Sequence, residues 1–292
     1  MPRSSFPPGT FGAACVPGIA GYHPAMVSIA SFHHAVIATG RAALSWLMGW
    51  GRIVHFGALI LVLTMSPSSY NRESRLVLAQ HLYANTAPIL MGFTLLCALV
   101  SMVLTRIVLV TALSYGLSQY ALQVVIRVLV LELIPLTAAL FVALRCTIPD
   151  GAELSQMRKR GELEAMRLRG VDPVAHEVLP RVVAGVFSSI TLAALSCVVA
   201  LFTAYVAIYG FTTTGFAVYT RLFGQVFTPV VTLIFLLKTL FFSLAVALIP
   251  MASGVYDIIT GPSRTSIEMR GLVRMFAVLL LIEVSSLVGN YY

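Results

Sequence analysis

Residues 152–181 have the sequence AELSQMRKRGELEAMRLRGVDPVAHEVLPR and form a charged island between long apolar segments. The rest of the chain is sparsely charged: 59% of its 292 residues are hydrophobic and only 10% are charged. This composition lies far outside soluble globular usage and indicates an integral membrane protein. Because a span needs about 20 apolar residues, the chain has room for roughly four to six spans and none for a second soluble domain.

Apolar runs predict five membrane-spanning helices, at about residues 87–112, 121–147, 182–209, 228–251 and 275–291. The segment at about 41–66 mixes apolar and basic residues, and its longest apolar run, 56–65, is too short to span a bilayer. We therefore expect an interfacial helix there. Residues 1–40 begin with a Pro- and Gly-rich stretch and are expected to be a mobile N-terminal extension.

The distribution of Lys and Arg predicts the orientation of the spans. On one side of the predicted membrane the basic residues are few, and the main ones are Arg106, Arg127 and Arg221. The two basic loops, after the second span and before the fifth, contain Arg158, Lys159, Arg160, Arg167, Arg169, Arg181, Arg264, Arg270 and Arg274. This asymmetry places the island and the N-terminus in the cytoplasm and the C-terminus outside. The net charge of +8 therefore reports topology, and no nucleic-acid partner is expected.

Local signals inside the island predict a helix, a break and a second helix. Good helix formers fill 153–169, interrupted only by Gly161. Gly170 suits a left-handed helix end, and Asp172 followed by Pro173 suits an N-cap and a first helical turn. The six acidic residues from Asp150 to Glu177 match the six basic residues of the island, so it is a mixed-charge surface. It is either a docking element for a cytoplasmic protein or a solvated hairpin without a partner.

Sequence signals for covalent chemistry are missing. The chain contains no G-x-x-x-x-G-K-[ST] phosphate loop, no G-x-S-x-G elbow and no H-E-x-x-H pair. Its four cysteines are far apart and are expected to be small packing residues. The adjacent His33 and His34 lack further ligands, so no metal site is expected. The sequence thus predicts no catalytic residues.

The region from Glu132 to Gly185 resembles the signature region of a transporter family. The family pattern is approximately R-E-L-G-P, A-G-R, A-E-L-x-x-M, E-Q-I-D-A-L-x-x-M-x-V-D-P and P-R-x-x-A-G. The matching residues here are Glu132, Leu133, Pro135, Ala143, Arg145, Ala152, Glu153, Leu154, Met157, Glu162, Leu163, Glu164, Ala165, Met166, Val171, Asp172, Pro173, Pro180, Arg181, Ala184 and Gly185. They resemble those of MlaE-type permeases, the transmembrane subunits of ABC transporters that move phospholipids and other lipids between membranes. The chain departs from the pattern at Leu131, Ile134, Gly161 and Arg169.

The resemblance extends from about Gly40 to the C-terminus and implies an all-α integral membrane protein of the bacterial inner membrane. Residues 41–292 would form the permease domain of a homodimer, with an interfacial elbow helix, five spans and a cytoplasmic coupling region at 150–181. A separate MlaF-like ATPase subunit would bind ATP and Mg, a MlaD-like MCE-domain protein would bind on the periplasmic side, and a MlaB-like STAS-domain protein is an optional partner. The implied coupling helix, 153–172, and its base contribute Glu153, Met157, Glu162, Met166, Arg169, Asp172 and Arg181.

Three ionisable residues lie deep in the predicted spans: Glu132, Lys238 and Glu283. An isolated charge there costs at least about 2.5 kcal/mol, so we expect the three side chains to contact one another. They form either a structural ion-pair cluster or pairs that break and re-form during transport. Arg127 competes as a partner or extends to the headgroups.

The implied lipid cavity lies between two protomers, and candidate lining residues on the first span are Leu95, Leu99, Met102 and Val103. A long apolar stripe on a membrane helix also serves for packing or for contact with lipid. Two other classes of function stay open. They are an intramembrane lipid-modifying enzyme, for which the catalytic roles are mostly unfilled, and a membrane scaffold that transports nothing.

Overall fold

The computed structural model describes residues 48–65, 72–116, 118–256 and 265–291. Within these ranges 93% of the residues are helical and none lies in a strand. Six of the described helices are long and apolar enough to cross a membrane. The prediction of an all-α integral membrane protein is therefore confirmed.

The chain divides into two units, Met1–Gly49 and Trp50–Tyr292. Of the first unit only Met48 and Gly49 are described, and both are helical. The predicted mobile extension, the pair His33 and His34, and Cys15 lie outside the described residues. All other described residues belong to the second unit.

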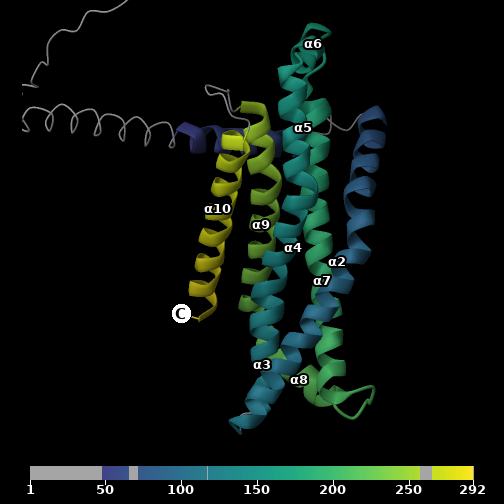
Figure 1. The fold of residues 1–292 in the computed structure, drawn as a ribbon, viewed down its shortest axis with the longest axis vertical. Coiled ribbons are helices and arrows are strands. Elements are labelled where there is room, and N and C mark those ends of the chain that lie inside the picture. The colour runs from purple at the N-terminus through teal and green to yellow at the C-terminus, as the bar shows by residue number, and fades with distance from the viewer. Residues whose placement is uncertain (1–47, 66–71, 117, 257–264, 292) are drawn as a thin grey trace, which may run out of the picture. The chain divides into compact units, whose positions relative to one another are not determined.

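Long helices make up most of this unit (Figure 1). Four of them are α2 (Arg72–Ser114), α7 (Leu179–Tyr209), α9 (Pro229–Tyr256) and α10 (Thr265–Tyr291). Two shorter segments flank α7: the π-helical η4 (Val174–Val178) leads into it, and α8 (Phe216–Val226) follows it. The α2 and α7 helices pack along one another, as do α9 and α10.

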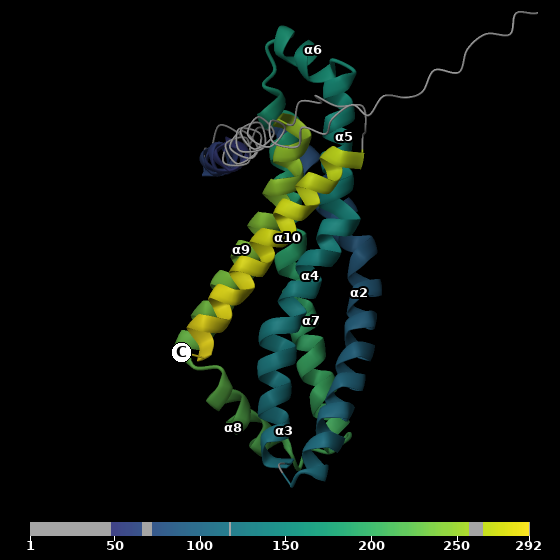
Figure 2. The same ribbon diagram turned by 60° about the vertical axis from the view of Figure 1, so that its left-hand side comes forward.

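A fifth long rod is assembled from consecutive helical segments that alternate between α- and π-helical geometry. They are α3 (Ser118–Val124), η2 (Val125–Leu133), α4 (Ile134–Val142), η3 (Ala143–Thr147) and α5 (Ile148–Lys159). The stretch Tyr120–Lys159 has 40 residues, which at about 1.5 Å per residue gives a length of roughly 60 Å. The hydrocarbon core of a bilayer is only about 30 Å thick. The rod must therefore project from the membrane, and its α5 end lies far from α3 and α8 (Figure 2).

The charged island differs from the prediction at one point. Gly161 has φ +76° and separates α5 from the short helix α6 (Glu162–Leu168). The predicted coupling helix 153–172 is therefore wrong as a single helix: its first part continues the membrane rod, and its second part is α6. Gly170 has φ +80° and ends α6, as its sequence position predicts.

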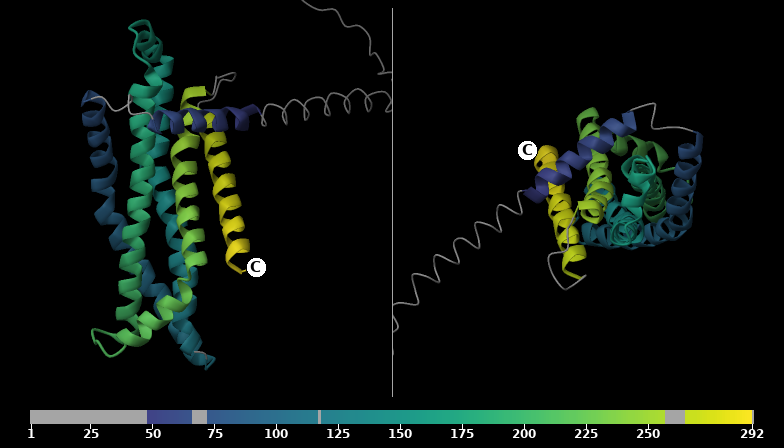
Figure 3. Two further views of the ribbon diagram at one scale, coloured as in Figure 1. Left: turned by 180° about the vertical axis from the view of Figure 1, so that it is seen from behind. Right: turned by 90° about the horizontal axis from the view of Figure 1, so that it is seen from above.

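Residues 50–65, the part of the helix Met48–Met65 that belongs to this unit, lie across the bundle (Figure 3). Phe56 and Ile60 are buried in a cluster with Leu154 of α5, Val182 of α7 and Met251 of α9. By length and composition this helix could also cross a membrane, because all 18 of its residues are counted and not only the uninterrupted apolar run 56–65. Its interfacial placement stays a prediction.

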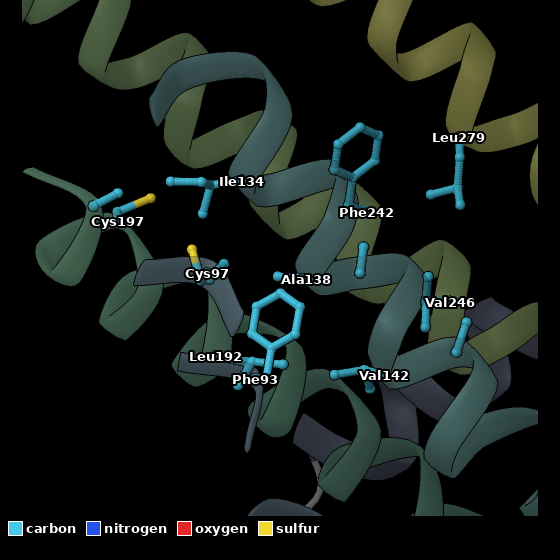
Figure 4. Close-up of a cluster of buried hydrophobic side chains, with 14 of the residues drawn as sticks. Phe93, Cys97, Ile134, Ala138, Val142, Leu192, Cys197, Phe242, Val246 and Leu279 are labelled. Atoms are coloured by element: carbon cyan, nitrogen blue, oxygen red, sulfur yellow. The ribbon is translucent and has the colours of Figure 1, made fainter. Parts of the chain in front are cut away.

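The main core joins α2, the rod, α7, α9 and α10. Figure 4 shows Phe93, Ile134, Leu192, Phe242 and Leu279 converging from these elements. The described cysteines, Cys97, Cys146 and Cys197, are buried and free. Since lipid tails are as apolar as leucine, such helices are held by close packing and hydrogen bonds rather than by hydrophobicity.

Glycines allow the projecting part of the rod to pack tightly on α9. A Cβ atom built on Gly254 would lie 2.4 Å from the carbonyl oxygen of Gly151, and one built on Gly151 would lie 2.7 Å from that of Pro250. Neither position tolerates a side chain without moving backbone. The α5 helix is thus in direct backbone contact with α9.

Candidate functional site

The charge cluster is built around Lys238, whose side chain is 1% exposed on α9. Its ammonium Nζ forms an ion pair with Glu132 Oε2 on η2 and lies 2.8 Å from Glu283 Oε2 on α10. The expected contact among the three side chains is present. It joins three separate helices at one point inside the apolar bundle.

Further groups complete the surroundings of this cluster. Lys238 Nζ also donates to the carbonyl oxygen of Leu131 at 3.3 Å, and it lies 5.6 Å from the centroid of the Phe242 ring. Asn290 Nδ2 donates to Glu132 Oε1 at 3.3 Å. Sequence reasoning missed Asn290, although its position seven residues after Glu283 places both on one face of a helix.

Arg127 takes no part in the cluster. It lies on η2 with its side chain exposed and forms no ion pair with any described residue. The cluster therefore contains two carboxylates and one ammonium. This arrangement satisfies the rule that charges inside a membrane pair with one another and face the interior of the bundle.

The exposed tip of the island is the part beyond Gly161. None of the residues of α6 is buried, and Leu168 is 84% exposed. Of the predicted coupling residues, Glu162, Met166, Arg169 and Asp172 lie in this tip. Asp172 Oδ1 accepts a hydrogen bond from the backbone N–H of Val174 at 3.1 Å, which is the capping geometry expected from the sequence.

The other three predicted coupling residues lie at the base of the island, where Arg181 contacts both Glu153 and Met157. Arg181, which is buried at the start of α7, places Nη2 3.4 Å from Glu153 Oε1 and Nη1 3.2 Å from Glu177 Oε2. Its Nη1 also lies 3.8 Å from Met157 Sδ. These residues attach α5 to α7 within one chain.

A second attachment joins α5 to α9. Arg158 Nη1 donates to the carbonyl oxygen of Val255 at 2.7 Å. Together with the backbone contact between Gly151 and Gly254, this bond ties the projecting end of the rod to the helix that carries Lys238. The projecting end of the rod is therefore held against α9 by both a hydrogen bond and close backbone packing.

The candidate cavity residues Leu95, Leu99, Met102 and Val103 are exposed on α2. The buried face of the same helix carries Phe93, Cys97, Ser101 and Thr105. The four candidates therefore share the outward face of α2, and within the described residues of one chain they line no cavity.

The helices and the buried charge cluster define a multi-pass membrane protein. A family model described as Permease MlaE matches residues 78–288, which is more than two thirds of the chain. The chain belongs to this permease family, whose members are membrane subunits of transporters. A comparison with curated proteins gave no match. The matched range contains Glu132, Lys238, Glu283 and the whole charged island.

Proposed function

We propose that this chain is the permease subunit of an ABC transporter that moves phospholipid or a related lipid between the inner and outer membranes of a bacterium. The observation that carries the proposal is the continuous rod, which joins the intramembrane cluster at Glu132 to a charged tip beyond Lys159. Membership of the MlaE permease family supports it. A pore or a simple anchor needs no such rigid extension.

The rod serves as a lever for an ATPase on a separate chain, which binds the ATP and Mg. The tip offers a partner an exposed helix with Leu168 at its end. The attachments at Arg181 and Arg158 connect that tip to α7 and α9. Closure of nucleotide-bound ATPase subunits would then move these helices together, as in other shear and hinge transitions.

The proposed assembly is a homodimer with the tip and the N-terminus in the cytoplasm and the C-terminus in the periplasm. The basic residues gathered near the tip support this orientation. The exposed apolar face of α2 would lie toward the lipid pathway. A periplasmic MlaD-like MCE-domain protein and an optional cytoplasmic MlaB-like STAS-domain protein complete the assembly.

Purification of the tagged chain from its native membranes tests the coupling role. An ATPase is expected to co-purify with the chain and to be lost with Leu168→Asp, which places a charge on the tip. Phe211→Asp is the matched control, since Phe211 is 90% exposed in the loop between α7 and α8. ATPase retention in Leu168→Asp, or its equal loss in both variants, would contradict a docking site at the tip.

A further inference from the structure

Pro135 interrupts the hydrogen bonding of the rod next to the charge cluster. Proline has no backbone N–H, so it removes one bond to a carbonyl on the preceding turn. If the helix is α-helical at this point, the carbonyl that loses its donor is that of Leu131. If the helix is π-helical, it is that of Val130. Both geometries are relevant, because Pro135 follows the π-helical η2 directly and the N–H of Ile134 bonds to Leu129 in the π manner.

Side chains from other helices supply donors to those two carbonyls. Lys238 Nζ donates to Leu131 O at 3.3 Å, and Cys197 Sγ donates to Val130 O at 3.8 Å. Leu131 is 4% exposed and Val130 is 1% exposed. Water does not reach such carbonyls inside the bundle, so the donors must come from protein.

The neighbouring carbonyls show the same pattern. Thr137 Oγ1 bonds to Leu133 O at 2.8 Å and to Ile134 O at 3.1 Å. Four of the five carbonyls from Val130 to Ile134 thus accept from side chains, two from other helices and two from Thr137 of the rod itself. The donors from α7 and α9 distinguish this break, because Thr side chains bond to the preceding turn elsewhere in the bundle as well.

We propose that Lys238 caps the helix break at Pro135 in addition to forming ion pairs with the two glutamates. An ammonium group has three N–H donors and no acceptor. It donates here to Glu132 Oε2 and Leu131 O, and it forms an ion pair with Glu283 Oε2 at 2.8 Å. The ammonium therefore serves a backbone carbonyl as well as the two carboxylates.

The cap makes the conformation of the rod depend on the position of Lys238. If the ammonium leaves Leu131 O, that carbonyl loses its donor in a dry environment, and η2 must shift its hydrogen bonding to recover one. The ion cluster and the break in the rod then act as one device. This inference concerns the helix itself and holds whether or not the chain transports lipid.

A double-mutant cycle in the full-length chain tests the cap. The neutral background is Glu132→Gln, Lys238→Met and Glu283→Gln together, which removes the ammonium without leaving a carboxylate unpaired. Pro135→Ala restores an N–H to the rod. The measurement is the thermal unfolding midpoint of each purified chain in detergent, with and without Pro135→Ala.

The cap predicts that Pro135→Ala raises the midpoint more in the neutral background than in the wild type, by about 1–2 °C, the effect of one hydrogen bond in a chain of this size. Equal shifts in both backgrounds would overturn the proposal, because independent sites add. Pro88→Ala in α2, a helix that gives no residue to the cluster, is the control and is expected to shift both backgrounds equally. If the neutral background does not fold, Pro135→Ala is expected to restore folding and Pro88→Ala is not; failure of Pro135→Ala to restore it also overturns the proposal.

Discussion

The Arg181 guanidinium lies 3.4 Å from the Glu153 carboxylate, and this ion pair ties the base of α7 to the projecting end of the rod. The two partners differ in environment, because the Arg181 side chain is 6% exposed and that of Glu153 is 60% exposed. The contribution of this ion pair to the stability of the chain therefore depends mainly on Arg181, the buried partner. Its second partner, Glu177, is itself largely buried.

Arg181→Ala is expected to destabilise the chain by about 3–5 kcal/mol, because it leaves Glu177 without its buried counter-charge. Arg181→Lys keeps the charge but not the fork that reaches two carboxylates, so it should restore only part of the loss. Chemical denaturation in detergent measures both. Arg160→Ala is the control, since the Arg160 pair with Glu162 is exposed, and its effect should stay below about 1 kcal/mol. Equal losses at Arg181 and Arg160 would show that the attachment contributes nothing.

Lys238→Ala is expected to impair lipid transport or assembly, because both carboxylates of the cluster lose their partner. Neutralising Glu132 or Glu283 as well should restore part of the function. Transport by the reconstituted complex and the yield of assembled complex are the two measurements. Unchanged transport in the single variant would rule out both the structural and the transport role of the cluster.

Gly254→Ala is expected to separate α5 from α9 and to cost about 1–3 kcal/mol, the usual penalty for overpacking. The added Cβ would meet the carbonyl oxygen of Gly151, which belongs to rigid backbone. Gly92→Ala in α2 is the matched control, because nothing lies within 4 Å of its added Cβ. Helix propensity alone predicts a gain of up to about 1 kcal/mol there. A larger loss of stability in Gly92→Ala than in Gly254→Ala would contradict the close packing of α5 on α9.

Asp172→Ala is expected to loosen the segment that links α6 to α7, at a cost of about 0.5–2 kcal/mol. The lost interaction is the hydrogen bond from the N–H of Val174 to Asp172 Oδ1. Hydrogen exchange at residues 170–176 should accelerate, while Asp172→Asn should stay close to the wild type because asparagine caps equally well. Unchanged exchange in Asp172→Ala would show that this cap does not hold the segment.

The sequence predicted the helical class and the contact of Glu132, Lys238 and Glu283, because the cost of placing charge in a membrane leaves few alternatives. It could not predict the full length of the rod. The apolar run ends near Thr147, but the helix continues to Lys159. Beyond Thr147 the helix leaves the apolar run, so hydropathy does not indicate where it ends.

Other features depend on tertiary contacts. A glycine such as Gly161 is tolerated inside a helix, so its left-handed conformation has no certain signal in the sequence. The π-helical geometry of η2 and the hydrogen bond from Asn290 to Glu132 arise from packing between distant helices. The four candidate cavity residues illustrate the same limit, because an apolar stripe does not say whether it faces lipid, a protomer or a cavity.

Transfer of labelled phospholipid by the purified chain, reconstituted in vesicles with its co-purified partners, tests the central claim most directly. The account predicts transfer that requires ATP hydrolysis by the separate ATPase subunit and that stops when Leu168→Asp detaches that subunit. Equal transfer without ATP or without the ATPase would contradict it, as would chemical conversion of the lipid by the chain alone.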